Sequence, residues 1–155
     1  NAANLDYVLR AFPNHHRALW TMIQWYMQNG RPPAADSPVP PAECWLQRAI
    51  AFRPKDPAVY TLYGIYLHLA GLPAKSIHYY KQALALDANS AEAHYNYGLV
   101  LVDLHRYQEA TEQAQRAYEL GYPLPGLRQR LQQAGYSVVL TKPVTDDSSR
   151  PVPEK

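Results

Sequence analysis

Small and apolar residues recur along the chain with a period of 34 residues. Shifting the sequence by that distance aligns identical residues, among them Gly64 with Gly98, Leu67 with Leu101 and Ala83 with Ala117. A glycine inside one helix, followed 19 positions later by a small residue, is typical of an array of two-helix units. No single unit of such an array can bury its own apolar face. We therefore expect any binding surface to be built by several units together.

The hydrophobic pattern also predicts individual helices. Segments 57–70 and 91–104 are apolar on nearly every side, as expected of inner helices that expose little surface. Residues 5–12 resemble the second helix of a unit whose first helix is missing. Residues 125–134 form an amphipathic pattern that ends at Gly135, which predicts a final capping helix of the kind that open arrays require.

Polar residues at the expected helix starts support these units. Asp56 precedes a proline and predicts the start of one helix, and Asn89 followed by Glu92 resembles a capping box at the start of another. Gly64 and Gly98 lie in the middle of these two helices. We expect both glycines to be structural, because a side chain at either position would meet the neighbouring helix of the same unit.

The chain thus divides into a helical repeat domain, residues 1–140, and a tail, residues 141–155. The expected parts of the domain are a half unit at 1–15, units at 16–56, 57–90 and 91–124, and the capping helix at 125–135. The first full unit is longer because residues 31–41, with five prolines, separate its helices and favour extended backbone. This segment is either a ligand for an aromatic groove or a tolerated surface loop. The tail is rich in proline, serine and charge, so we expect it to be disordered.

The last full unit carries four residues of a known repeat pattern. They stand at positions 8, 17, 20 and 27 of that unit and are Gly98, Tyr107, Ala110 and Ala117. On these residues the chain resembles the tetratricopeptide repeat, although Ile23 replaces the glycine in the first full unit. The resemblance implies an all-α fold, a right-handed superhelical array of antiparallel helix hairpins. It also implies a function in protein–protein interaction.

A second resemblance concerns the beginning of the chain. Residues 5–19 look like segments of small exported proteobacterial repeat proteins. This favours a periplasmic or envelope-associated location over a cytoplasmic one. Because the pattern starts inside a unit, we expect the chain to be a trimmed fragment of a longer polypeptide.

The resemblance also implies where a partner would bind. In tetratricopeptide arrays the first helix of each unit turns one face toward the concave side, at unit positions 5, 9 and 12. Residues at these positions have i, i+4, i+7 spacing and share one helix face, which here is mostly apolar and suits a partner helix or an extended hydrophobic peptide. With three polar neighbours, the candidate groove residues are Arg17, Trp20, Gln24, Met27, Thr61, Ile65, His68, Tyr95, Asn96, Leu99, Val102 and Asp103. The alternative is that Ile65, Leu99 and Val102 are ordinary core residues.

Related repeat proteins clamp the terminal carboxylate of a chaperone chain with a set of Lys, Asn and Arg residues on these helices. Of that set only Asn96 has a match here, and Arg17 alone supplies charge. A carboxylate clamp is therefore not expected.

Charge and residue spacing argue against several other functions. The formal net charge is +2, from 15 basic and 13 acidic residues that are scattered, so nucleic acid binding is not expected. The most apolar segment, 58–72, is shorter than the roughly 20 residues of a membrane-spanning helix. Six histidines lack metal-binding spacing and Cys44 has no nearby histidine, so we expect no metal, cofactor or catalytic set. Only His68 and Asp103 come close to a catalytic pair.

We therefore predict a non-enzymatic adaptor or scaffold that binds a peptide or helix of a partner protein. The bound segment would be hydrophobic. The partner protein would act in the assembly of a bacterial envelope complex. The alternative is a structural module that forms homo-oligomers by stacking the ends of its repeat array.

Overall fold

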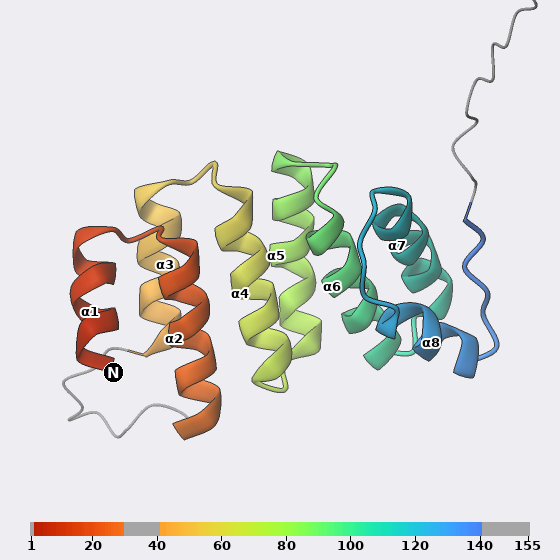
Figure 1. Ribbon diagram of the computed structural model, residues 1–155, viewed down its shortest axis with the longest axis horizontal. Coiled ribbons are helices and arrows are strands. Elements are labelled where there is room, and N and C mark those ends of the chain that lie inside the picture. Colours follow the sequence, from red (N-terminus) through yellow and green to blue (C-terminus); the bar gives the residue numbers. More distant parts are fainter. Residues whose placement is uncertain (1, 30–40, 141–155) are drawn as a thin grey trace, which may run out of the picture.

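The structure is a computed structural model that describes residues 2–29 and 41–140. These residues form eight α-helices and the connections between them (Figure 1). They are α1 (Ala2–Ala11), α2 (His16–Asn29), α3 (Ala42–Phe52), α4 (Pro57–Leu69), α5 (Pro73–Leu86), α6 (Ala91–Asp103), α7 (Tyr107–Glu119) and α8 (Gly126–Gln133). These residues contain no strand, so the predicted all-α fold is confirmed. The predicted extended segment 31–41, apart from Pro41, and the predicted disordered tail lie outside the described residues.

The helices pair into hairpins that stack in one row, from α1 at one end to α8 at the other (Figure 1). The pairs are α2 with α3, α4 with α5, and α6 with α7. Helix α1 packs on α2, and α8 packs on both helices of the last hairpin. The first helices α2, α4 and α6 also contact one another in sequence along the row. Within the described residues, every helix is too short or too polar to cross a lipid bilayer.

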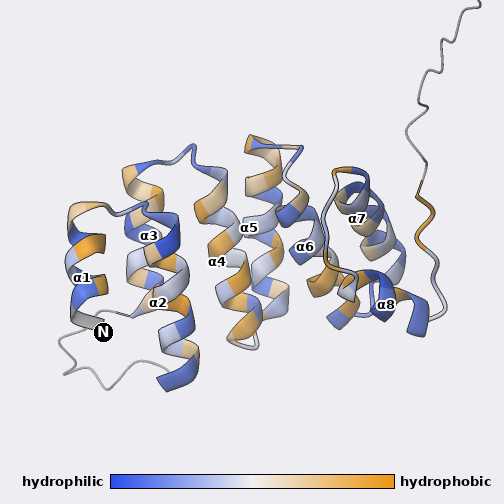
Figure 2. Ribbon diagram, viewed as in Figure 1, coloured by the Kyte–Doolittle hydropathy of each residue, from blue (hydrophilic) through white to orange (hydrophobic). Residues whose placement is uncertain are grey.

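Two hydrophobic clusters follow one another along this row (Figure 2). The first is built by α1 to α4 and includes Leu19, Tyr26 and Leu46. The second lies mainly within α5 to α8 and includes Tyr80 and Leu127. Each cluster draws residues from more than one hairpin, because a single hairpin cannot cover its own apolar face.

Both mid-helix glycines allow a close approach between helices. A Cβ added to Gly64 would lie 2.7 Å from Cζ of Tyr80 on α5, so the predicted contact within the same unit is confirmed. A Cβ added to Gly98 would lie 2.5 Å from Cδ2 of Leu127 on α8. The prediction is therefore wrong for Gly98, whose close neighbour is the capping helix. The nearest atom of α7 to this added Cβ is the Ala110 carbonyl oxygen, at an ordinary van der Waals distance of 3.5 Å.

Side-chain caps define the starts of two first helices. The backbone N–H of Ala58 donates to Oδ1 of Asp56 at 3.2 Å, which confirms the predicted cap of α4. At α6 the cap is Ser90, whose Oγ accepts from the N–H of Ala93 at 3.2 Å. The capping box predicted at Asn89 is wrong, because the helix starts one residue later than that box requires.

Candidate functional site

A hollow of about 420 Å³ lies where α2, α4 and α6 come together. We call it the central hollow. Its lining residues are His16, Arg17, Trp20, Ala58, Thr61, Leu62, Ile65, Glu92, Asn96 and Tyr122. Nine of these ten residues come from the first helices of three successive hairpins, and Tyr122 comes from the connection after α7. The hollow therefore exists only because the hairpins stack.

The middle helix supplies the apolar part of the central hollow. Helix α4 lies between α2 and α6 and contributes two apolar side chains, Leu62 and Ile65, with the small residue Ala58 near its start. Trp20 of α2 adds a half-buried indole that also packs against the first hydrophobic cluster. Such a mixture of aliphatic and aromatic surface is typical of sites that bind apolar side chains of a ligand.

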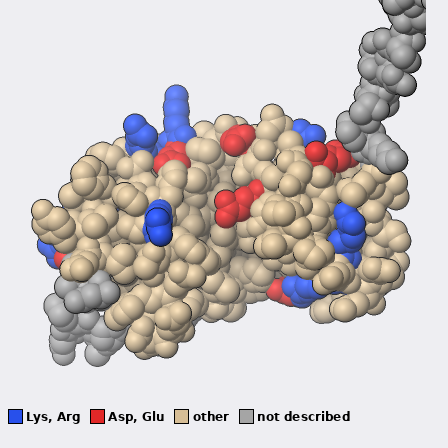
Figure 3. All heavy atoms as spheres, viewed as in Figure 1, with Lys and Arg blue, Asp and Glu red and all other residues tan. Residues whose placement is uncertain are grey.

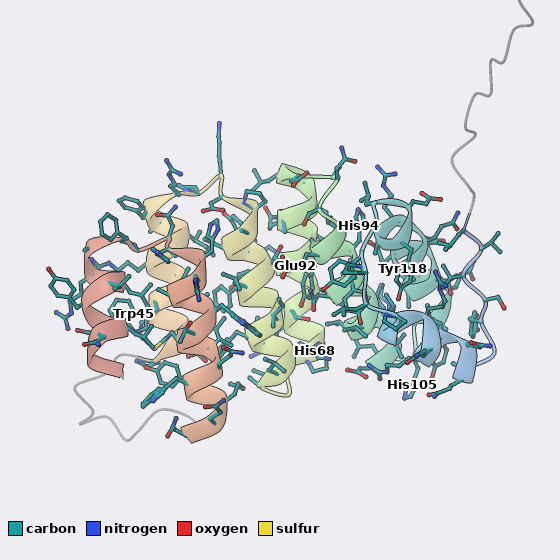
Figure 4. The ribbon with its side chains drawn as sticks, viewed as in Figure 1. Trp45, His68, Glu92, His94, His105 and Tyr118 are labelled. Atoms are coloured by element: carbon teal, nitrogen blue, oxygen red, sulfur yellow. The ribbon has the colours of Figure 1, made fainter. Side chains whose placement is uncertain are left out.

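Polar groups lie on the two outer helices. Arg17 is an exposed residue of α2, and Glu92 is an exposed residue of α6 that lies near the middle of the array in Figure 4. Asn96, one turn after Glu92, donates from Nδ2 to the Glu92 carbonyl oxygen at 2.9 Å. Burial and then the nearby Glu92 carboxylate raise the pKa of Tyr122, which indicates that this negative charge reaches the Tyr122 end of the hollow.

A hydrogen-bonded cluster fixes the start of α2 beside the hollow. His16 Nε2 lies 2.7 Å from Asp56 Oδ2, and Asn14 Nδ2 donates to the same oxygen at 3.2 Å. Burial acts to raise the pKa of the Asp56 carboxyl, but the hydrogen bonds from His16 and Asn14 outweigh it and lower the pKa below its ordinary value of 3.8. Both Asp56 oxygens are thus engaged within the protein, and the carboxylate serves to join α2 to α4.

Five of the predicted groove residues meet in the central hollow, and two are core residues. The five are Arg17, Trp20, Thr61, Ile65 and Asn96. Tyr95 and Val102, predicted as groove lining, are buried in the second hydrophobic cluster and do not line this hollow. Tyr95 stacks on Tyr122 with ring centroids 4.2 Å apart, because the connection to α8 folds over this part of α6.

The other predicted residues lie outside the hollow. Met27 and Leu99 are half-buried against the two hydrophobic clusters, and Gln24 is exposed. His68 and Asp103 are in contact, with His68 Nε2 2.5 Å from Asp103 Oδ2. Arg130 of α8 also donates to Asp103, so the carboxylate joins α4, α6 and α8 near the opposite end of these helices from Glu92 (Figure 4).

Other surface features of the described residues are less specific. A larger hollow of about 630 Å³ lies at the turn between α3 and α4, but apart from His16 its lining comes from residues 52–57 alone. Charged side chains are scattered over the face seen in Figure 3, most of which is uncharged. Within residues 2–29 and 41–140, no three His, Cys, Asp or Glu side chains come together as ligands for a metal ion.

Comparison with known proteins identifies the architecture. Residues 79–112 match the family model of the tetratricopeptide repeat. The structure of TTC0263, a tetratricopeptide-repeat protein of Thermus thermophilus, is similar over 86% of this chain and 70% of that chain, with 19% sequence identity and a TM-score of 0.62. The chain has the tetratricopeptide-repeat fold. The predicted resemblance to this repeat is thereby confirmed, whereas the proteobacterial exported type stays a prediction.

Two further solved structures share this fold. MamA is similar over 86% of this chain and 74% of that chain, with 21% identity and a TM-score of 0.63. PilW, described as a widely conserved type IV pilus biogenesis factor, is similar over 86% of this chain and 60% of that chain, with 20% identity and a TM-score of 0.64. No curated protein gives a significant sequence match.

The repeat frame explains which residues sequence reasoning missed. Apart from His16 at position 1 and Tyr122 in the connection after α7, the lining residues stand at unit positions 2, 5, 6 and 9, whereas the family resemblance predicts positions 5, 9 and 12. The missed residues are His16, Ala58, Leu62, Glu92 and Tyr122. Positions 2, 5, 6 and 9 have i, i+3, i+4, i+7 spacing and form one helix face, so the pattern was available in the sequence. On α6, Tyr122 covers Tyr95 at position 5 and itself lines the hollow.

Proposed function

We propose that the protein is a non-enzymatic adaptor whose central hollow holds a short segment of a partner protein. The observation that carries this proposal is that three successive hairpins contribute side chains to one partly apolar hollow. A site that depends on the stacking of hairpins suits recognition of a ligand that reaches across them. The tetratricopeptide fold is compatible with this role, although a fold by itself does not define a function.

The size of the hollow favours an extended segment over a helix as its occupant. Its volume of about 420 Å³ lies in the lower half of the range of about 300–1,000 Å³ for pockets that bury small ligands. An α-helix with side chains is about 10–12 Å in diameter and would need a longer and wider groove. A few residues of extended chain, with one or two side chains directed inward, fit this space better.

We further propose assembly of a bacterial envelope complex as the setting for this interaction. The support is that PilW, a protein of similar fold, is described as a type IV pilus biogenesis factor. The competing function is self-assembly through the ends of the array. Its support is the side chain of Tyr7 on α1, which is 76% exposed at one end of the row.

The proposal is tested with peptides selected without bias from a random display library on the purified protein. Binding is then mapped by two-dimensional NMR, which resolves the Trp20 indole N–H and the Asn96 side-chain amide. We expect both signals to shift, and Ile65→Asp to weaken binding by more than about tenfold through a charge in the apolar part of the hollow.

Leu69→Asp is the matched control, because Leu69 lies one turn further along α4, is 53% exposed and lies outside the hollow. It should leave binding unchanged. Circular dichroism establishes whether both variants fold. If Ile65→Asp does not fold, Asn96→Ala is used as a milder change in the hollow. If the selected peptides shift only NMR signals of residues in the turn between α3 and α4, the proposed site is wrong.

A further inference from the structure

We propose that the central hollow selects a mixed-charge segment, in which an apolar side chain lies between a carboxylate that meets Arg17 and a cation that meets Glu92. This inference rests on the proposed function and names the chemistry of the partner segment. It starts from one row of equivalent residues. Unit position 2 is Arg17 on α2, Ala58 on α4 and Glu92 on α6, and all three line the hollow.

This row places opposite charges on the two sides of an uncharged middle. Helix α4 lies between α2 and α6, so a guanidinium and a carboxylate flank the methyl group of Ala58. Arg17 and Glu92 are both exposed, and neither charged group has an ion pair or hydrogen bond with another described residue. Both charges are therefore available to a ligand.

The other titratable groups around the hollow do not alter the balance of one positive and one negative charge. His16 is held by Asp56, whose two carboxylate oxygens are already engaged by His16, Asn14 and the backbone of Ala58. Tyr122 adds a neutral phenol, and burial raises its pKa. Arg17 and Glu92 thus provide the unpaired charges of the described lining.

Electrostatic complementarity then favours one class of ligand. A segment with two acidic side chains would place one of them near Glu92, and a segment with two basic side chains would place one near Arg17. Juxtaposed like charges oppose binding, whereas one charge of each sign satisfies both sides. Between the charges, a leucine or phenylalanine side chain would contact Trp20, Leu62 and Ile65.

The geometry of packed helices sets the spacing of the two ligand charges. Neighbouring helix axes lie about 8–10 Å apart, so α2 and α6 are separated by about 16–20 Å, and the Arg17 and Glu92 side chains shorten the gap. Extended backbone rises about 3.3 Å per residue. The acidic and basic residues of the ligand should therefore be about four or five positions apart.

Four synthetic seven-residue peptides test this inference. Each peptide has a central leucine and serine spacers. The four peptides differ only at positions 2 and 6, which carry aspartate and lysine, two aspartates, two lysines, or two serines. Titrations at low ionic strength are followed by NMR through the Trp20 indole and Asn96 amide signals. We expect the mixed-charge peptide to bind the unmodified protein most tightly, by about fivefold over each like-charge peptide.

Charge reversal should exchange these preferences. Arg17→Glu makes both sides acidic and should favour the dilysine peptide, and Glu92→Lys makes both sides basic and should favour the diaspartate peptide. Matched controls are Lys75→Glu and Glu112→Lys, exposed positions on the second helices α5 and α7 that make the same changes in net charge. These controls should leave the order of the four peptides as in the unmodified protein.

The outcomes separate this inference from the proposed function. If the serine peptide binds as well as the mixed-charge peptide, or if the reversals leave the order unchanged, the charge selection is wrong while the hollow remains the site. If none of the four peptides shifts the signals but library-selected peptides do, the charge selection is also wrong. If neither group of peptides shifts them, the proposed function fails as well.

Discussion

At the scale of single residues, contacts of a few atoms set how closely the helices pack. Tyr80 is fully buried, and its ring lies directly over the backbone of Gly64. It also stacks on Tyr97, with ring centroids 5.8 Å apart. The ring thus has no room to move away from α4, and a larger residue at position 64 would have to push α4 and α5 apart.

We predict that Gly64→Ala destabilises the protein by about 1–3 kcal/mol through overpacking. The added methyl group would lie 2.7 Å from Tyr80 Cζ and 2.9 Å from its two Cε atoms. Urea unfolding followed by circular dichroism measures the change. The same substitution in a Tyr80→Leu background should instead be neutral or stabilising by about 0.5–1 kcal/mol, because alanine is the better helix former once the ring is gone. Equal losses in both backgrounds would contradict this account.

At the scale of elements, Asp103 connects three helices that are far apart in the sequence. It accepts from His68 of α4 and from Arg130 of α8, while it lies at the end of α6. Burial acts to raise the pKa of the Asp103 carboxyl, but the hydrogen bonds from Arg130 and His68 and their charges outweigh it, and the pKa falls below its ordinary value of 3.8. The ionised carboxylate therefore favours the folded state.

The sign of this shift predicts a loss of stability in acid. A carboxyl with a lowered folded pKa contributes stability that is present above its unfolded pKa and is lost as the pH falls through the folded value. We expect Asp103→Asn to lower the melting temperature at pH 6 and to reduce the further decrease below about pH 4.

Some acid dependence should remain in this variant, because the pKa of Asp56 is lowered in the same way. Glu112→Gln, an exposed carboxyl on α7, should leave the pH profile unchanged. Melting curves of Asp103→Asn parallel to those of the unmodified protein from pH 6 to pH 3 would show that the contact with His68 and Arg130 does not stabilise the fold.

At the scale of the whole molecule, the two ends of the row differ. At one end α8 covers Gly98 and closes the second hydrophobic cluster with two fully buried leucines, Leu127 and Leu131. At the other end α1 presents the exposed ring of Tyr7, while its Leu5 and Val8 pack inward on the first cluster. Exposed apolar side chains also follow α8, at Tyr136, Val139 and Leu140, so two arrays could stack at either end.

An adaptor with an unfilled hollow should be monomeric, which separates the two proposed functions. We predict that light scattering gives the mass of one chain, 17.6 kDa, across a hundredfold range of protein concentration. The exposed rings of Tyr7 and Phe12 together provide far less apolar area than the roughly 1,200 Å² or more that stable interfaces bury. A mass that rises with concentration, and returns to one chain in Tyr7→Ser, would favour self-assembly instead.

Much of the fold could be predicted from the sequence because helices and repeats are recorded in local patterns. The 34-residue period, the apolar inner helices, the cap at Asp56 and the final helix before Gly135 all depend on residues close together in the chain. The period also predicted that a groove would be shared by several units. Five of the twelve groove residues predicted on this basis meet in the central hollow, Ile65 among them.

Which face of each first helix remains accessible depends on contacts between helices that no local pattern contains. Tyr95 and Leu99 lie on the same helix face, yet the connection through Tyr122 makes Tyr95 a core residue, and this depends on how α8 packs on α6. Likewise, Arg17 and Glu92 are 75 residues apart in the chain and come to one hollow only because the hairpins stack. Helix formation is a local property of the chain, whereas exposure and the pairing of charges depend on neighbours that only the folded array brings together.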